Sequence, residues 1–221
     1  MTKNLPTYTR TCRNFGTAVF VIAATQTFAA QISAQIRDPA GQPVADAVIY
    51  AVMTSGVVPA RPKREISVEQ IDKEFVPLVS VIQSGTMVSF PNRDKVRHHV
   101  YSFSPAKTFE IKLYSGVPGK PIMFDKPGEV VLGCNIHDSM IAYMLVVDTP
   151  FFAKSDKRGT ALLENLPTGD YELHMWYPGA AASATPLSQK TKLSASDAVT
   201  LTFAFTLKPQ SPSVPRPSAG K

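Results

Sequence analysis

The stretch FDKPGEVVLGCNIHDSM, residues 124–140, ends in a loop that carries three side chains able to bind a soft metal ion. It lies in a region, Phe75 to Val147, in which short strands alternate with turns. The loop combines a thiolate, an imidazole and a thioether at Cys134, His137 and Met140, in the spacing CxxHxxM. Thiolate and thioether suit Cu(I), imidazole suits both oxidation states of copper, and few other metals take that mixture. The loop therefore predicts a copper site that needs a second imidazole from elsewhere in the chain.

That imidazole is available upstream in VSFPNRDKVRHHV, residues 88–100, where two of the chain's four histidines enter a strand. Side chains alternate between the two faces of a strand, so His98 shares a face with Val100. The apolar neighbour indicates that this face looks inward, and His99 then points outward with Tyr101. Two His, one Cys and a weak axial Met form the ligand set of blue-copper electron-transfer sites. The predicted metal ligands are His98, Cys134, His137 and Met140, with His99 as the alternative to His98.

Each of these side chains has a more ordinary interpretation when it is taken alone. A single cysteine or methionine is more often part of a hydrophobic core than a metal ligand. His174, in the segment YELHMW at residues 171–176, has no partner motif and is expected to be structural or exposed. The copper interpretation depends on the spacing within the loop, on the upstream histidines and on how the chain uses its two cysteines.

The first 34 residues are expected to be a secretory signal peptide that is removed on export to the periplasm. Lys3, Arg10 and Arg13 precede an apolar stretch at residues 15–30, small residues follow, and no acidic residue is present. The apolar stretch is shorter than the ~20 residues that span a bilayer, so no membrane span is expected after cleavage. Cys12 leaves with this segment. Cys134 is then the single cysteine of an exported protein, and such a thiol is expected to be buried or bound to metal.

Composition excludes several classes of function. The formal net charge of +6 falls to +3 without the signal segment, because that segment takes three positive charges with it. A charge this small gives no case for nucleic-acid binding. No nucleophile elbow, zinc-protease helix or phosphate-binding glycine loop occurs, and four protein ligands leave a metal no open position for catalysis. We therefore expect a protein that is not an enzyme.

The chain is expected to be all-β, because 19 prolines and 12 glycines separate short apolar runs. Residues 35–50 and 159–176 each predict a strand, a turn and a second strand, and a last strand is expected from about Val199 to Leu207. We expect Gln35–Val52 to pair with Gly159–Leu207, with Val48 and Leu173 in one core. The predicted organisation is a signal peptide at 1–34, a split β-sandwich at 35–55 and 150–207, a second β domain inserted at 56–149, and a disordered tail at 208–221. The alternative is one continuous sandwich that shares strands.

Two family resemblances support this organisation. The segments at 88–100 and 124–140 resemble the histidine strand and the copper loop of plastocyanins, pseudoazurins and amicyanin, and the whole resembles exported cupredoxins known as methylamine utilisation proteins. The flanking hairpins resemble the carboxypeptidase regulatory-like, transthyretin-type β-sandwich family. The resemblance implies a cupredoxin Greek-key β-sandwich inserted into a small regulatory-like sandwich, and one type 1 copper per chain. His99 departs from the family pattern, because plastocyanins carry Asn there.

The resemblance also implies a function. A type 1 copper protein of the periplasm carries single electrons, here between redox proteins such as a quinoprotein dehydrogenase and a c-type cytochrome. His137 is expected near the surface, within a docking rim formed by Ile136, Pro118 and Pro105. The alternative is a periplasmic copper carrier or sensor without a redox role, and a weaker one is an interaction protein with a vestigial copper centre. Reversible one-electron cycling distinguishes the first function from the other two.

Overall fold

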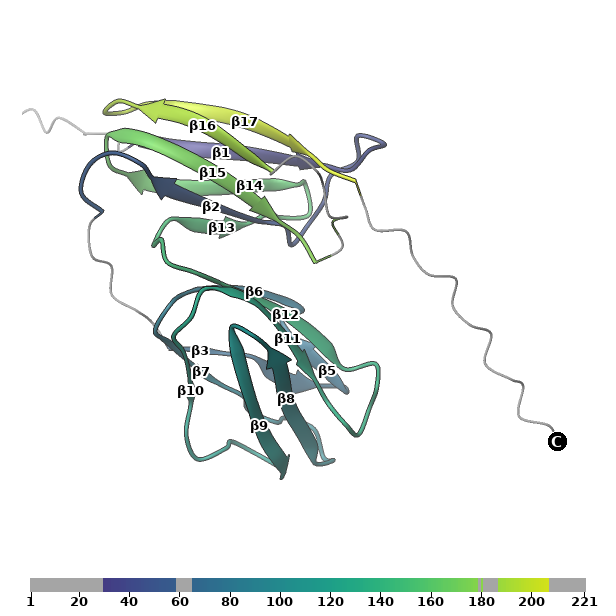
Figure 1. Cartoon of the computed structure of the whole chain (residues 1–221). Helices are drawn as coiled ribbons and strands as arrows, with labels where there is room; N and C mark the ends of the chain where they lie inside the picture. Colours follow the sequence, from purple (N-terminus) through teal and green to yellow (C-terminus); the bar gives the residue numbers. More distant parts are fainter. Residues whose placement is uncertain (1–29, 59–64, 179, 181–186, 207–221) are drawn as a thin grey trace, which may run out of the picture.

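The computed structural model describes residues 30–58, 65–178, 180 and 187–206, and every regular element within them is a β-strand (Figure 1). The expectation of an all-β protein is confirmed. In this described part of the chain, no helix has the length and apolar character needed to cross a membrane. The expected signal segment up to residue 29 and the expected tail at 208–221 lie outside the described residues.

The strands form two sandwiches, which we call terminal and central. The terminal sandwich contains β1 (Ala30–Arg37), β2 (Val48–Met53), β13 (Phe152–Lys154), β14 (Thr160–Leu166), β15 (Gly169–Trp176), β16 (Ser188–Leu193) and β17 (Ala198–Ala204). The central sandwich contains β3 (Ile66–Ser67), β4 (Glu69–Ile71), β5 (Glu74–Val76), β6 (Val79–Gln83), β7 (Thr86–Ser89), β8 (His98–Ser104), β9 (Lys107–Tyr114), β10 (Ile122–Phe124), β11 (Gly128–Gly133) and β12 (Ile141–Val147).

The terminal sandwich has sheets in the order β14-β1-β17 and β13-β2-β15-β16. Strand β1 pairs with β14 and β17, and β2 pairs with β15, so segments from both ends of the described chain share these sheets. The expectation that Val48 and Leu173 share a core is wrong. Leu173 packs inside the terminal sandwich, whereas Val48 lies on the opposite face of the same sheet. Successive residues of a strand face opposite sides, and Ala51, not Val48, stands opposite Leu173.

The start of β1 differs from the expected boundary at residues 34 and 35. The strand begins at Ala30, and Ala30, Ile32 and Ala34 are buried in the core of the terminal sandwich. The sequence AQISAQI at residues 30–36 alternates apolar and polar side chains, which is the pattern of a strand with one buried face. Residues 30–34, which we expected in the signal segment, therefore belong to a strand of the terminal sandwich.

The central sandwich packs a five-stranded sheet, β6-β12-β11-β8-β9, against the sheet β10-β7-β3. Its core contains fully buried aromatic and aliphatic side chains, among them Phe90, Phe124 and Leu132. Strands β8 and β11 are neighbours in the five-stranded sheet, with Gly133 opposite Tyr101. The end of β11 and the loop that follows it therefore lie beside the start of β8.

The two sandwiches are joined by a third apolar cluster, formed by Val48, Val79, Leu145 and Val147. Strand β12 has buried side chains on both of its faces. Met144 and Val146 belong to the core of the central sandwich, while Leu145 and Val147 belong to the cluster that faces the terminal sandwich. Two polar contacts flank the cluster: the Trp176 indole donates to Glu129 at 3.1 Å, and the Lys154 ammonium donates to the Val79 carbonyl at 2.7 Å. The terminal sandwich thus stacks on the β6 and β12 side of the central sandwich (Figure 1).

The start of β1 can be tested by comparing chains that begin at Ala30 and at Gln35. The shorter chain loses a buried isoleucine, two buried alanines and half of the central strand of its sheet. We expect its free energy of unfolding to fall by at least about 3 kcal/mol, from the lost apolar burial. Urea denaturation followed by circular dichroism measures the difference. Equal stability of the two chains would show that residues 30–34 contribute nothing to the core.

Candidate metal centre

His98, Cys134 and His137 are brought together at one end of the central sandwich. One ligand atom from each of these side chains lies within 4.8 Å of the other two. His98 begins β8 and is fully buried, and its Nδ1 lies 4.0 Å from Cys134 Sγ. Three side chains that could bind a metal, from the histidine strand and from the loop, thus lie close together.

The loop after β11 is held by its own backbone. The Cys134 sulfur is buried and accepts a weak hydrogen bond from the Ile136 amide at 3.4 Å. The Met140 amide donates to the His137 carbonyl at 2.9 Å, which closes a tight turn before β12. These contacts fix the three loop residues of the CxxHxxM spacing on a short, ordered piece of chain.

His137 belongs to the cluster and has a buried side-chain atom without a hydrogen-bond partner, a feature that it shares among the described residues with His99 and Gln70. Its ring meets the His98 ring edge-on, with centroids 5.3 Å apart. Its Nδ1 is buried and has no hydrogen-bond partner in the described part of the chain. A buried nitrogen without a partner is costly, and a metal ion between the two imidazoles and the thiolate would satisfy it. The residues present therefore fit a soft or borderline metal ion such as copper.

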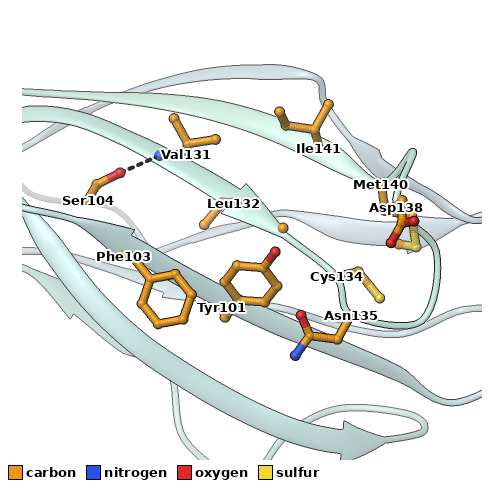
Figure 2. A pocket seen from close by; sticks show the side chains of 11 residues that line it. Tyr101, Phe103, Ser104, Val131, Leu132, Cys134, Asn135, Asp138, Met140 and Ile141 are labelled. Atoms are coloured by element: carbon orange, nitrogen blue, oxygen red, sulfur yellow. Dashed lines mark hydrogen bonds between the residues drawn. The ribbon is translucent and has the colours of Figure 1, made fainter. Parts of the chain in front are cut away.

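Met140 is buried in the same apolar cluster as Cys134. Both side chains line a hollow of about 530 Å³ at the edge of the loop, together with Asn135 and Asp138. Figure 2 shows the sulfur atoms of Cys134 and Met140 at the loop end of this hollow. A thioether is neutral and binds metals weakly. Met140 is therefore suited to adjust the reduction potential of a bound metal, and the other ligands would supply most of the binding affinity.

His99 lies on the other face of β8, as strand alternation predicts. Its Nε2 is 2.9 Å from the Glu110 carboxylate, and its ring packs beside Tyr101. It differs from the expectation in one respect: it is buried, because Glu110 and Tyr101 cover it. Of the two adjacent histidines, only His98 belongs to the cluster with Cys134 and His137.

Two polar residues that no motif in the sequence singles out hold the histidine strand in place. Asn92 is buried, donates to the carbonyls of Val96 and Tyr114 at 2.9 and 3.0 Å, and accepts from the Asp94 amide. The Asp94 carboxylate lies 2.7 Å from His98 Nε2. Their spacing within 88–100 was visible, but nothing in the sequence shows which groups they contact.

Tyr114, the residue opposite His98 on β9, is the titratable group most altered by this environment. Burial raises its pKa to about 12, and the Cys134 thiol nearby adds to the effect. Its hydroxyl donates to the Phe90 carbonyl at 2.6 Å and accepts from the buried Gln70 amide. A phenol is already protonated at neutral pH at its ordinary pKa of about 10, and burial moves this pKa further from neutrality, so Tyr114 adds no charge beside the centre.

The remaining sequence expectations lie away from the centre or at its edge. His174 stacks on Tyr50 with centroids 4.9 Å apart, within the terminal sandwich, as expected of a structural histidine. Ile136 is exposed and belongs to the loop, in agreement with its expected place in the rim. Pro105 does not belong there, because it lies in the turn after Ser104, at the end of β8 opposite His98.

No protein-family model matches the sequence, and no curated protein matches it. Three similar solved structures are a Cu-containing nitrite reductase from Thermus scotoductus, a pseudoazurin from Sinorhizobium meliltoi and a reduced Cu(I) amicyanin mutant. Their identities are 25%, 23% and 16%, and their TM-scores are 0.36, 0.30 and 0.35. The matches cover 43%, 39% and 44% of this chain, and 25%, 76% and 99% of those chains. This chain thus spans about a quarter of the nitrite reductase. At such TM-scores, the assignment of the centre rests on the side chains themselves.

The choice between the adjacent histidines gives a direct prediction. Replacing His98 with Ala removes a group of the cluster, so Cu(II) binding and its visible absorption should be lost. Replacing His99 with Ala removes contacts to Glu110 and Tyr101 outside the cluster and should leave both in place. Copper titration followed by visible spectroscopy makes the comparison. The reverse result would mean that the strand register is shifted by one residue.

Proposed function

We propose that this protein is a type 1 copper protein that carries single electrons, with one copper per chain. His98, Cys134 and His137 would hold the metal, and Met140 would be its weak axial ligand. The observation that carries the proposal is the convergence of two imidazoles and one thiolate within 4.8 Å, with His137 Nδ1 buried and unpartnered. Bound to such a set, copper supplies a one-electron couple.

The donor set favours an electron carrier over a structural zinc site or a catalytic metal. Structural zinc sites use four strong N or S donors, and here the fourth candidate is a neutral thioether. Catalytic sites keep an open position for substrate. The buried Met140 side chain is suited to close that position instead.

The scaffold suits fast electron transfer, because the groups around the metal have little freedom to move. His98 is fixed by β8, while Cys134 and Met140 stand at the ends of the two strands, β11 and β12, that flank the loop. On the other face of the five-stranded sheet, side chains of β6 and β12 pack against the terminal sandwich. Side chains locked by packing and hydrogen bonds keep a site in one geometry, so little reorganisation would accompany a change of oxidation state.

An exposed apolar surface at the same end of the molecule suits a redox partner. Val96, Val117 and Ile136 are 43%, 65% and 47% exposed. They belong to the loop before β8, the loop after β9 and the loop after β11, and Asn92 ties the first two together. Apolar groups rimmed by polar ones mark transient docking sites. We propose that this surface receives redox proteins of the periplasm, such as a c-type cytochrome or a quinoprotein dehydrogenase.

The proposal is tested on purified protein that lacks the signal segment. It should bind one copper per chain, turn intensely blue when oxidised, and show a reversible one-electron wave in voltammetry. Metal analysis and visible spectroscopy answer the first two points. Tight zinc binding without copper, or a colourless Cu(II) form, would contradict the copper centre. Copper that passes readily to a chelator and shows no reversible wave would favour the copper carrier instead.

The role of Met140 is tested by exchange for Gln. A harder oxygen ligand favours Cu(II), so Met140→Gln should lower the reduction potential while the protein still holds its copper. Met144, buried in the same core on β12, provides a matched control. Met144→Leu should leave the potential unchanged. Loss of copper from the Met140 variant, or an unchanged potential, would remove Met140 from the axial position.

A further inference from the structure

A carboxylate faces the nitrogen of His98 that points away from Cys134. Asp94 Oδ2 lies 2.7 Å from His98 Nε2, while His98 Nδ1 faces Cys134 Sγ. The His98 side chain is fully buried, and that of Asp94 is 13% exposed. One imidazole thus has one nitrogen on the proposed metal and the other on an acid that is shielded from water.

Asp94 is itself held by backbone groups from a distant part of the chain. Its two carboxylate oxygens accept the amides of Asp72 and Lys73, at 2.8 and 2.9 Å. Both residues form the turn between β4 and β5 with φ values of 54° and 63°, a left-handed conformation that turns two successive amides toward one acceptor. The Asp94 amide donates to Asn92 Oδ1 at 2.9 Å.

The β4–β5 hairpin is in turn fastened to the segment that contains Asp94. The Gln70 amide donates to the Pro91 carbonyl, and the Arg93 amide donates to the Gln70 carbonyl, each at 2.9 Å. The Arg93 guanidinium also pairs with the Glu69 carboxylate at 2.9 Å. The hairpin, Asp94 and His98 therefore form a continuous hydrogen-bonded chain that ends at the metal centre.

The carboxylate is surrounded by hydrogen-bond donors. It accepts from the backbone amides of Asp72 and Lys73 and faces the second ring nitrogen of His98, and such donors stabilise an anion. An anion that accepts from the second nitrogen of a ligating histidine fixes its tautomer and makes the imidazole more basic. A more basic imidazole stabilises Cu(II) more than Cu(I).

We propose that Asp94, anchored by the β4–β5 turn, is a positioning residue that fixes the proton of His98 on Nε2, aims Nδ1 at the metal and lowers the reduction potential. The part that concerns the potential rests on the proposed function. The part that concerns the tautomer does not, because it is a property of the copper-free protein.

The first test compares Asp94→Asn with Asp156→Asn in copper-loaded protein. Asp156 is a matched control, because its carboxylate also accepts two turn amides, from Arg158 and Thr160, but in the terminal sandwich. Asp94→Asn should shift the ratio of Cu(I) to Cu(II) affinity by about tenfold toward Cu(I), which raises the potential by ~59 mV. Asp156→Asn should leave it unchanged. Equal potentials in the two variants would overturn the effect on the couple.

The second test uses copper-free protein and compares the wild type with Asp94→Asn. Nitrogen-15 NMR of the imidazoles should place the His98 proton on Nε2, facing Asp94, with Nδ1 unprotonated. In Asp94→Asn the amide can offer either oxygen or NH₂ to the ring, so the two tautomers should mix. A wild-type proton on Nδ1 would overturn the positioning role. If the wild type binds no copper, the proposed function fails, while this measurement still decides the role of Asp94.

Discussion

The contact on which the centre depends is the approach of His98 Nδ1 to Cys134 Sγ, at 4.0 Å, across two neighbouring strands. Strand β8 presents the histidine, and Cys134 follows directly after the last residue of β11. Gly133, that last residue, has no side chain because the Tyr101 ring occupies the space: a Cβ there would meet it at 2.7 Å. A side chain at this position would collide with Tyr101, which stands opposite Gly133 where the two strands pair. Once that register is set, the short loop after β11 determines where His137 and Met140 lie.

The stacked architecture explains why such a contact stays in place. A sheet in an isolated sandwich has one face in water, but strands β6 and β12 of the five-stranded sheet have the central core on one face and an apolar joint to the terminal sandwich on the other. Strand β12, which leaves the metal loop, contributes to both. Movement of the loop end would disturb two packed layers, and closely packed interiors resist such changes. The terminal sandwich thus supports the centre without touching it.

The sequence predicted the parts of the site that depend on local spacing. CxxHxxM lies on one loop, and alternation along a strand separates His98 from His99, so both inferences needed only neighbouring residues. Asp94 was missed because its anchors are the backbone amides of residues 72 and 73, which no side-chain pattern reveals. The hairpin patterns predicted that β2 pairs with β15. They did not predict the core to which Val48 belongs, because that depends on which sheet packs on each face of β2. The predicted boundary between the signal segment and the first strand, at residue 34, was wrong because alanines are typical of both a cleavage site and a buried strand.

The central claim is that one thiolate and two imidazoles hold a single copper in a geometry set by the fold. X-ray absorption at the copper edge, recorded on the oxidised and the reduced protein, tests it most directly. The account predicts one sulfur and two nitrogen donors at short distance in both states, with nearly the same distances. Coordination by nitrogen and oxygen alone, or a change in the number of short ligands between the two states, would contradict it.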